Sequence, residues 1–488
     1  MPLTGEIGPF SSAIAMRRAL KLKQISASEL LELHLKRVAK FDASLNSIVV
    51  KDFERAQSAA READKYLAAG DERPLLGVPI TIKESLDVEG LPSTAGVEAR
   101  RGHAAARDSR TVARIRAAGA VILGKTNVCT WLADYQSDNP VYGRTNNPWN
   151  LSRTSGGSSG GSATVAAGLA AIDIGSDLGG SIRVPPAFCG LWGHRPSDTA
   201  VCSSGHFPGS DYPNVAVTMA IQGPQARSAH DCEVALDVMA GPDVGMDAAW
   251  KLNLPPARHD NLRAFRIAAL PAPSWLPVDS QIVNAFAKTV EVLKQAGATV
   301  QELAPPLGDL RHYYALFRSM MAAIVSVHWP AKLREQGIDE KLSSGDEFMA
   351  ADARGLNATS AQYIQWHELR EKYRCAWRSF FEQWDILLTP MTLTPAFKHT
   401  SIPTIDRMLD VGSIQVPFDN MSFYPGLPTL AGHPATAFPA GFTSDGLPIG
   451  LQAIGPFLED RTPLRFAQFY EDLTGGFRQP TDFAANTF

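Results

Sequence analysis

The segment that most clearly suggests chemistry is a run of nine small residues, Thr154-Ser155-Gly156-Gly157-Ser158-Ser159-Gly160-Gly161-Ser162. Such residues add little to a core, but they let the backbone approach a ligand closely and leave N–H groups free to donate hydrogen bonds. An Ala-rich apolar segment follows at once, whereas a flexible linker would continue with polar residues. The run therefore predicts a functional loop more strongly than a linker.

The same run matches the nucleophile-elbow pattern G-x-S-x-G twice, centred on Ser158 and on Ser159. An elbow needs a strand that enters the serine and a helix that leaves it. The Ala-rich helix is expected, but residues 146–150 are turn-like, which counts against an elbow. A Ser-His-Asp hydrolase, with His194 or His206 as the base, therefore stays an alternative.

A second candidate loop is Asp177-Leu178-Gly179-Gly180-Ser181-Ile182-Arg183-Val184-Pro185. Two glycines before a serine suit a tight turn whose N–H groups converge as an oxyanion hole. Pro185 and Pro186 prevent a long regular element. Taken alone, an ordinary turn capped by Ser181 would explain the segment better.

Lys83 follows an apolar segment, residues 77–82, that is expected to be a buried strand. A serine hydroxyl needs a base within hydrogen-bond reach, and a lysine is protonated at its usual pKa of about 10.4. Burial can lower that pKa by several units. The alternative is an ordinary lysine at a strand end, paired with Glu84 or Asp87.

Residues 119–126 are a literal match to the phosphate-binding pattern G-x4-G-K-T. The four intervening residues, however, are themselves apolar and are expected to form a buried strand, which cannot wrap a triphosphate. Nucleotide binding is therefore the least favoured function.

The composition of the chain argues against several classes of partner and of site. The 488 residues are 45% apolar and 20% charged, with a net charge of −4 and no stretch that resembles a polybasic arm, so neither a nucleic-acid nor a membrane partner is expected. The five cysteines contain no CxxC pair, and no HExxH motif occurs among the eleven histidines. We expect no metal site, no disulfide framework, no signal peptide and a cytoplasmic location.

The elements that must position these residues alternate between strands and helices. Strands are expected at 77–82, 120–123, 171–174, 386–389, 435–439 and 447–454, and helices at 26–38, 52–69, 109–118, 163–169, 281–296, 312–327 and 361–384. This alternation predicts an α/β fold with a largely covered sheet. We expect one domain over 1–488, composed of N-terminal helices (1–70), a core (71–240), a helical, substrate-side insertion (250–380), and strands and a helix that complete the core (381–488).

Several motifs in order resemble the amidase signature family. They are Gly77-Val78-Pro79-Ile80-Thr81-Ile82-Lys83-Glu84, Gly124-Lys125-Thr126-Asn127, the two Gly/Ser-rich segments, Gly223-Pro224-x-Ala226-Arg227-Ser228 and Asp445-Gly446-Leu447-Pro448-Ile449-Gly450-Leu451-Gln452. The similarity spans residues 24 to 475 and is weakest between 250 and 380. It implies a central, mixed, twisted sheet covered on both faces by helices.

The resemblance also implies roles for individual residues. Ser181 would be the nucleophile, Ser158 the bridging serine after a cis peptide bond, and Lys83 the general base. The oxyanion hole would consist of the N–H groups of Leu178, Gly179, Gly180 and Ser181, and the substrate-binding residues would be Gly157, Cys129, Thr130 and Trp131. The expected reaction is hydrolysis of a carboxamide C–N bond through an acyl-enzyme, without a cofactor.

Two departures from the family pattern matter. The spacing from Ser158 to Ser181 is one residue shorter than usual, which leaves Ser159 as an alternative bridging residue. Cys129-Thr130-Trp131 replaces the usual Pro-Glu-Phe, so substrate specificity does not carry over from relatives. The alternative to a stand-alone amidase with a small-molecule substrate is the catalytic subunit of an aminoacyl-tRNA amidotransferase, and a homodimer is left open.

The poorly matching insertion is rich in aromatic and Met residues. We expect most of them to be core, and any that line the cleft would favour aryl or alkyl amides, anilides, esters or carbamates. They are Trp275, Tyr313, Tyr314, Phe317, Met320, Met321 and Trp329.

Overall fold

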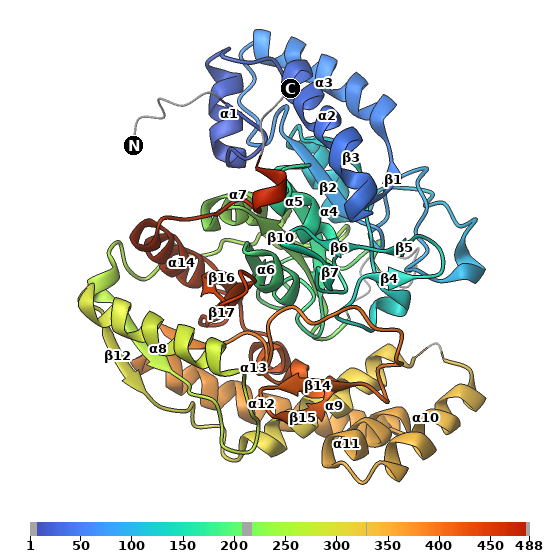
Figure 1. Ribbon diagram of the computed structural model, residues 1–488, viewed down its shortest axis with the longest axis vertical. Helices are drawn as coiled ribbons and strands as arrows, with labels where there is room; N and C mark the ends of the chain where they lie inside the picture. Colours follow the sequence, from blue (N-terminus) through green and yellow to red (C-terminus); the bar gives the residue numbers. More distant parts are fainter. Residues whose placement is uncertain (1–6, 207–216, 328, 485–488) are drawn as a thin grey trace.

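The computed structural model of the chain describes residues 7–206, 217–327 and 329–484 (Figure 1). An eleven-stranded sheet forms its centre, in the order β1-β3-β2-β8-β10-β9-β16-β17-β13-β11-β12. The strands are β1 (Ile48–Lys51), β2 (Pro79–Lys83), β3 (Val121–Thr126), β8 (Ile172–Asp177), β9 (Trp192–Arg195), β10 (Ile221–Ala226), β11 (Arg266–Ala269), β12 (Thr299–Glu302), β13 (Ile386–Pro390), β16 (Ala435–Phe442) and β17 (Pro448–Ile454).

The sheet is mixed, as the family resemblance implied. β2 is parallel to both β3 and β8, and β11 is parallel to both β12 and β13. The strands between β8 and β13 pair antiparallel. Strands from the first half of the chain and from its end therefore share one sheet, because β9 pairs with β16.

Helices occur along the whole described chain. They are α1 (Ala13–Lys21), α2 (Ala27–Leu45), α3 (Phe53–Ala68), α4 (Arg110–Ala117), α5 (Gly161–Ala166), α6 (Val184–Cys189), α7 (Ala229–Met239), α8 (Ser280–Gln295), α9 (Leu310–Val325), α10 (Ala331–Ser343), α11 (Glu347–Leu356), α12 (Ser360–Gln383), α13 (Phe423–Ala431) and α14 (Arg461–Thr474). Short 3-10 helices are η1 (Glu98–Arg100), η2 (Thr130–Leu132), η3 (Leu262–Ala264), η4 (Phe418–Ser422) and η5 (Thr481–Phe483).

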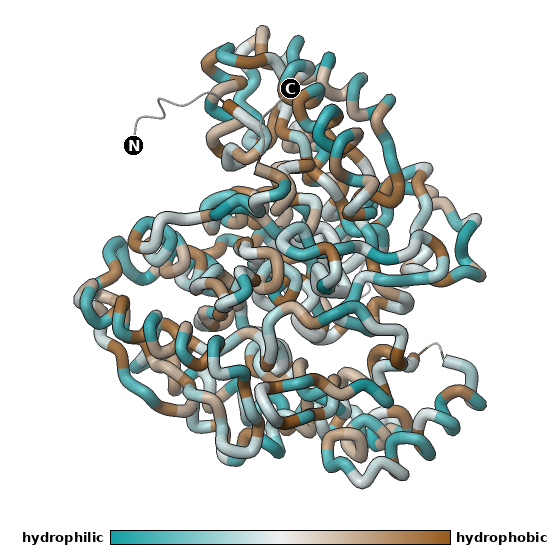
Figure 2. Tube along the Cα trace, viewed as in Figure 1, coloured by the Kyte–Doolittle hydropathy of each residue, from teal (hydrophilic) through white to brown (hydrophobic). Residues whose placement is uncertain are grey.

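Helices cover both faces of the sheet, which confirms the predicted α/β architecture. On one face α5 and α6 pack together, and α6 reaches β17 where Ala187 lies against Gly450. On the other face α7 and α14 pack side by side, and α8 contacts the neighbouring Ile449. The outer helices alternate between hydrophilic and hydrophobic residues (Figure 2), as expected when only one stripe of a helix faces a core.

Several helices begin where the sequence predicts. Ser26 caps α2 in a capping box with Glu29, since each residue's side chain accepts a hydrogen bond from the other's backbone N–H. Ser109 likewise caps α4. The short α5 begins two residues earlier than predicted and ends before Gly168, whose positive φ of 71° is incompatible with a continuing helix.

Two regions differ from the sequence-based expectation. Residues 146–154, which begin with the predicted turn, contain the hairpin β6 (Asn146–Asn147) and β7 (Asn150–Thr154). The insertion is mainly helical as expected, but it also contributes β11 and β12 to the end of the sheet. Neither strand is a continuous apolar run like those that predict the other strands, since β11 begins with Arg266 and β12 is polar and mostly exposed. Smaller hairpins are β4 (Asp138–Asn139) with β5 (Gly143–Arg144), and β14 (Met408–Val411) with β15 (Ile414–Pro417).

Among the described helices, none is both long enough and apolar enough to span a membrane. The last described element lies against the first helices, because Arg37 on α2 donates a 2.7 Å hydrogen bond to the carbonyl of Phe483. The division of the chain into the four predicted segments stays a prediction.

Candidate active site

Lys83 is the last residue of β2 and is completely buried. Its Nζ donates to Ser158 Oγ at 2.7 Å and to Ser176 Oγ at 2.9 Å. Burial lowers the pKa of Lys83 to about 8, although the neighbouring Cys129 and the carboxylates of Asp177 and Asp173 act in the opposite direction. About a tenth of this amine is therefore neutral at pH 7, far more than at the usual pKa of a lysine.

Ser158 lies in the loop before α5 and follows a cis peptide bond from Gly157. Gly157 packs against the loop that follows η2, where an added β carbon would lie only 2.4 Å from the carbonyl oxygen of Asp134. Ser159 faces elsewhere, since its hydroxyl donates to the backbone carbonyl of Ser176 at 3.3 Å. The structure thus places Ser158, not Ser159, against the lysine.

Ser181 lies in the turn between β8 and α6 and is 8% exposed. Its hydroxyl makes no hydrogen bond with any other described residue, and it lines the same cavity as Ser158 and Ser176. Two parallel strands, β2 and β8, end side by side here, which is where open α/β sheets place their ligands.

The turn that carries Ser181 is built around Asp177. The carboxylate of Asp177 accepts hydrogen bonds from the N–H groups of Gly180 at 2.8 Å and Ile182 at 3.2 Å. Gly180 has φ 110°, and a β carbon there would lie 2.8 Å from Pro425, so only glycine fits. The Gly180 N–H predicted for the oxyanion hole is therefore already engaged, whereas those of Leu178, Gly179 and Ser181 have no partner among the described residues.

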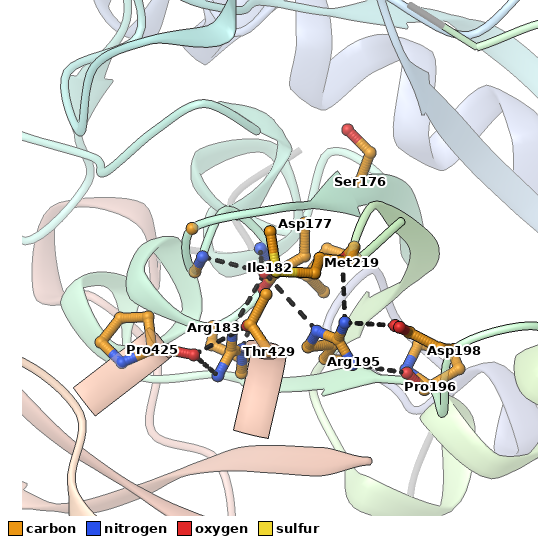
Figure 3. A network of polar contacts seen from close by, with 12 residues as sticks. Ser176, Asp177, Ile182, Arg183, Arg195, Pro196, Asp198, Met219, Pro425 and Thr429 are labelled. Carbon is orange, nitrogen blue, oxygen red and sulfur yellow. Dashed lines mark hydrogen bonds and ion pairs between the residues drawn. The ribbon is translucent and has the colours of Figure 1, made fainter. Parts of the chain in front are cut away.

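Arg183 holds this carboxylate from the opposite side (Figure 3). Its Nε and Nη2 lie 2.9 Å from the two oxygens of Asp177, and its remaining donors reach Pro425, Thr429 and Gln452. Burial alone would raise the pKa of Asp177, but the charges of Arg183 and Arg195, with these hydrogen bonds, keep it below the usual value. Asp177 is thus a buried anion that fixes the turn.

The cavity beside these residues has a volume of about 200 Å³. Loops from the sheet form one side, and α9, α11 and η4 form the other. Its lining is Trp131, Leu132, Ala133, Asp134, Tyr135, Ser158, Ser176, Asp177, Leu178, Gly179, Ser181, Ser203, His206, Val217, Ala220, Arg318, Met321, Ile324, Val325, Asp352, Phe418, Asp419 and Ser422.

Comparison with known proteins identifies the family to which this chain belongs. A family model described as Amidase matches residues 29–464, most of the chain. The chain belongs to the amidase family. Its membership confirms the predicted enzyme class, an amidohydrolase that acts on C–N bonds other than peptide bonds.

Two relatives and one solved structure illustrate the family. The chain is 33% identical, over 94% of both chains, to a glutamyl-tRNA(Gln) amidotransferase subunit of Roseiflexus castenholzii. It is 31% identical, over 96% of its own length and 90% of the relative's, to fatty-acid amide hydrolase 2-A of Danio rerio. A bacterial aryl acylamidase of the amidase signature family superimposes with a TM-score of 0.80 at 25% identity, covering 98% of this chain and 99% of that chain.

The four residues expected to bind substrate separate into two groups. Trp131, in η2, lines the cavity, whereas Gly157, Cys129 and Thr130 do not. The thiol of Cys129 is buried and both donates to and accepts from the backbone of Asp134 at 3.1 Å. Cys129 therefore holds the shape of the loop behind the cavity wall of this amidase.

Of the aromatic and Met residues proposed for the cleft wall, only Met321 lines the cavity. Tyr313, Tyr314, Phe317 and Met320 are buried in the core of the insertion, as expected for most of them. Trp275 packs against the same core from its edge, and Trp329 lies outside the cavity lining.

The two histidines considered as alternative bases lie in different places. His194 is buried away from the cavity, between Thr436 at 2.9 Å and Asp460 at 3.3 Å. His206 does line the cavity, but burial, and then the positive charge of Lys83, lower its pKa to about 3. Such a weak base is poorly suited to deprotonate a serine.

The segment that matches the phosphate-binding pattern contains β3, which is buried throughout. Lys125 in this strand donates to Ser93 Oγ at 2.9 Å and also bonds the carbonyl of Pro92. Its amine is therefore engaged inside the protein, and the buried strand is the one that the sequence analysis predicts.

Sequence reasoning missed the residues that complete the site. Ser176 shares the lysine with Ser158, and Tyr135 donates its hydroxyl hydrogen to the carbonyl of Gly179. Arg318, Asp352 and Asp419 line the cavity from the insertion and from η4. Only Ser176 carried a local signal, since it stands directly before the Asp177 motif, two residues after the predicted strand 171–174.

Proposed function

We propose that the enzyme hydrolyses the C–N bond of carboxamides through an acyl-enzyme on Ser181. The observation that carries the proposal is the 2.7 Å hydrogen bond from a buried lysine, Lys83, to Ser158, which lines the same cavity as Ser181. A hydroxyl nucleophile requires a base within reach, and burial keeps part of this amine neutral, and so able to accept a proton, near pH 7.

In the proposed mechanism, the neutral amine of Lys83 takes the proton of Ser158 as Ser158 takes the proton of Ser181. The oxygen of Ser181 attacks the substrate carbonyl, and the resulting oxyanion accepts hydrogen bonds from the free N–H groups of Leu178, Gly179 and Ser181. The proton returns along the same path to the leaving nitrogen, because an amine leaves poorly as an anion. A water molecule, activated in the same way, then releases the acid.

The residues that line the cavity favour substrates in which the amide carries an apolar aryl or alkyl group. Apolar side chains surround most of it: Trp131, Leu132, Leu178, Val217, Met321, Ile324, Val325 and Phe418. Similar chains bear the names aryl acylamidase and fatty-acid amide hydrolase, which agrees with such substrates. Apolar esters and carbamates present the same carbonyl and would fit the same space.

A turnover screen of anilides, primary amides, esters and carbamates tests the proposal, with Ser181→Ala as the inactive reference. We expect a bulky anilide to be cleaved faster than acetamide, and a fluorophosphonate to label Ser181. Equal rates on acetamide and on the anilide would contradict the proposed substrate class. Labelling at another residue, or full activity of Ser181→Ala, would contradict the nucleophile.

A second candidate is the catalytic subunit of an aminoacyl-tRNA amidotransferase. The observation in its favour is the 33% identity, over 94% of the chain, to a protein that bears the name of such an enzyme. Catalytic subunits of this kind work with partner chains, so affinity purification from the native host distinguishes the two. Purification of the chain alone or as a homodimer, together with hydrolysis of anilides, supports the first candidate. Stoichiometric partner chains, with activity on glutamine only in their presence, support the second.

The described structure has all five cysteines as free thiols. The cytoplasmic location stays a prediction.

A further inference from the structure

The cavity that holds Ser181 also contains a cluster of charged side chains that the proposed chemistry does not use. Arg318 on α9, Asp352 on α11 and Asp419 on η4 all line it. Arg318 is only 1% exposed at its side chain and Asp352 6%, whereas Asp419 is 26% exposed. Charged groups held this deep in a mostly apolar cavity require partners.

Arg318 and Asp352 form a buried ion pair and use most of each other's hydrogen-bonding capacity. Asp352 accepts from Nε of Arg318 at 2.8 Å, from Nη2 of the same guanidinium and from Nζ of Lys341 at 2.8 Å. The third nitrogen of Arg318 donates to the hydroxyl of Tyr314 at 3.2 Å. These two residues therefore have little capacity left for a ligand.

Asp419 has such capacity. Its Oδ2 accepts one hydrogen bond, from Arg318 at 3.1 Å, and its Oδ1 accepts none from any described residue. Its backbone carbonyl is engaged separately, by Tyr314 and by Ser422. Asp419 lines the cavity, and a carboxylate oxygen without a donor there is a strong acceptor for a bound ligand.

The position of Asp419 relative to the nucleophile follows from two contacts. Met321 lies over the turn, since a β carbon at Gly179 would be 3.5 Å from its sulfur. Arg318 precedes Met321 by three residues, about 4.5 Å along the axis of α9. Phe418, next to Asp419, packs against Tyr135 with the ring centroids 5.8 Å apart and the rings tilted. Tyr135 in turn donates a hydrogen bond to the carbonyl of Gly179. A substrate group that extends from Ser181 would therefore pass Met321 and Phe418 before it reaches Asp419.

The charge balance of the cluster selects the kind of group. The cations of Arg318 and Lys341 are matched by the carboxylates of Asp352 and Asp419. The nearby Arg407 is matched in the same way by Asp134, at 2.8 Å. An ionic ligand would leave a net charge in this buried region, whereas a neutral donor would not.

Building on the proposed function, we propose that the enzyme selects amides whose apolar part ends in a neutral hydrogen-bond donor, such as a hydroxyl or a carboxamide N–H, which Asp419 accepts. The apolar part lies against Met321 and Phe418. Substrates that end in a carboxylate are rejected, because that group would face Asp419 directly.

Matched anilides test this inference. One series carries acyl chains of increasing length that end in methyl, hydroxyl, ammonium or carboxylate, and a second carries the same groups on the aryl ring. At the length that spans the cavity, we expect kcat/KM for the hydroxyl compound to exceed that of the methyl compound by about tenfold, the lower end of the effect of a hydrogen bond to a charged group. The carboxylate compound is expected to be the slowest of the four.

Variants assign the preference to one side chain. Asp419→Ala removes the difference between hydroxyl and methyl compounds, and Asp419→Asn, which keeps an acceptor oxygen and the shape, retains part of it. Asp410→Ala, an exposed carboxylate on β14, serves as the control and leaves the preference unchanged. Thermal unfolding shows whether each variant is folded, and Asp419→Asn carries the test if Asp419→Ala is not.

The outcomes separate this inference from the proposed function. Hydrolysis of every anilide with equal kcat/KM for hydroxyl and methyl compounds overturns the inference alone. A maximum for the ammonium or the carboxylate compound overturns the neutral-donor assignment. Hydrolysis of none of them overturns the proposed function, and the inference with it.

Discussion

Arg183 and Asp177 form an ion pair in which both side chains are fully buried, with Arg183 Nη2 2.9 Å from Asp177 Oδ1. The same carboxylate accepts the N–H groups of Gly180 and Ile182, on either side of Ser181. The position of Ser181, the proposed nucleophile, therefore depends on an interaction that makes no contact with the serine itself.

Arg183→Met is expected to lower the free energy of unfolding by about 3–5 kcal/mol, because it leaves Asp177 buried without its cation. Denaturant unfolding measures this loss, and kcat of the folded fraction should fall as the turn loosens. Arg461→Met, which breaks an ion pair to Asp237 at the surface, is the control and should change stability by at most about 1 kcal/mol. Equal effects of the two substitutions would show that the buried pair does not hold the turn.

Ser158→Ala and Ser159→Ala are adjacent substitutions with opposite expected outcomes. Ser158 contacts Lys83, so its loss interrupts proton transfer and should lower kcat by about 10²–10⁴-fold. Ser159 faces the backbone of β8, so its replacement should leave most of the activity. Steady-state kinetics on one anilide decides, and a larger loss for Ser159→Ala would transfer the bridging role to that residue.

Met320 and Met321 offer a second adjacent pair. Met320 is completely buried in the core of the insertion, so Met320→Ala should lower the free energy of unfolding by about 2–5 kcal/mol. Met321 lines the cavity, so Met321→Ala should mainly raise KM for bulky anilides. Denaturant unfolding and KM are measured for both variants. A higher KM for Met320→Ala and a loss of stability for Met321→Ala would show that Met320, and not Met321, faces the cavity.

The proposed catalytic residues are largely readable from the sequence because the signals for them are local. Lys83, Ser158 and Ser181 each stand in a short segment whose glycines, prolines and apolar neighbours determine the backbone nearby. The order of these segments then indicated the family, and with it a covered, mixed sheet. Asp177 is part of one of the family motifs, but the motif does not show that its carboxylate accepts a hydrogen bond from the N–H of Gly180.

The cavity walls could not be read in the same way. Arg318, Asp352 and Asp419 lie on three elements far apart in the chain, and each would pass for a solvated surface charge in its own segment. Met321 is one of seven aromatic and Met residues that could line the cleft, because the sequence does not show which side of α9 faces Ser181. The strands β11 and β12 were missed because neither is a continuous apolar run, and β12 is polar and mostly exposed at the end of the sheet.

His206 provides a test of the alternative base. It lines the cavity, but burial and the charge of Lys83 lower its pKa to about 3. His206→Gln should therefore lower kcat far less than Lys83→Met and leave the pH dependence of kcat/KM in place. Loss of all activity, together with loss of the pH dependence, would instead support a histidine-dependent hydrolase.

The protonation state of Lys83 gives the enzyme a defined pH dependence. Burial lowers the pKa of Lys83 to about 8, and only the neutral amine can accept the proton. Below this pKa the logarithm of kcat/KM should rise with pH at a slope near one, with about a tenth of the enzyme active at pH 7, and it should level off above the pKa.

The most direct measurement of the central claim is that pH profile in Lys83→Met beside Lys125→Met. Both lysines are fully buried and both have a pKa lowered to about 8, but only Lys83 contacts Ser158. Lys83→Met is expected to lose nearly all activity at every pH, while Lys125→Met, where it is folded, keeps the rising limb near pH 8. Parent-like activity of Lys83→Met at neutral pH would contradict the account.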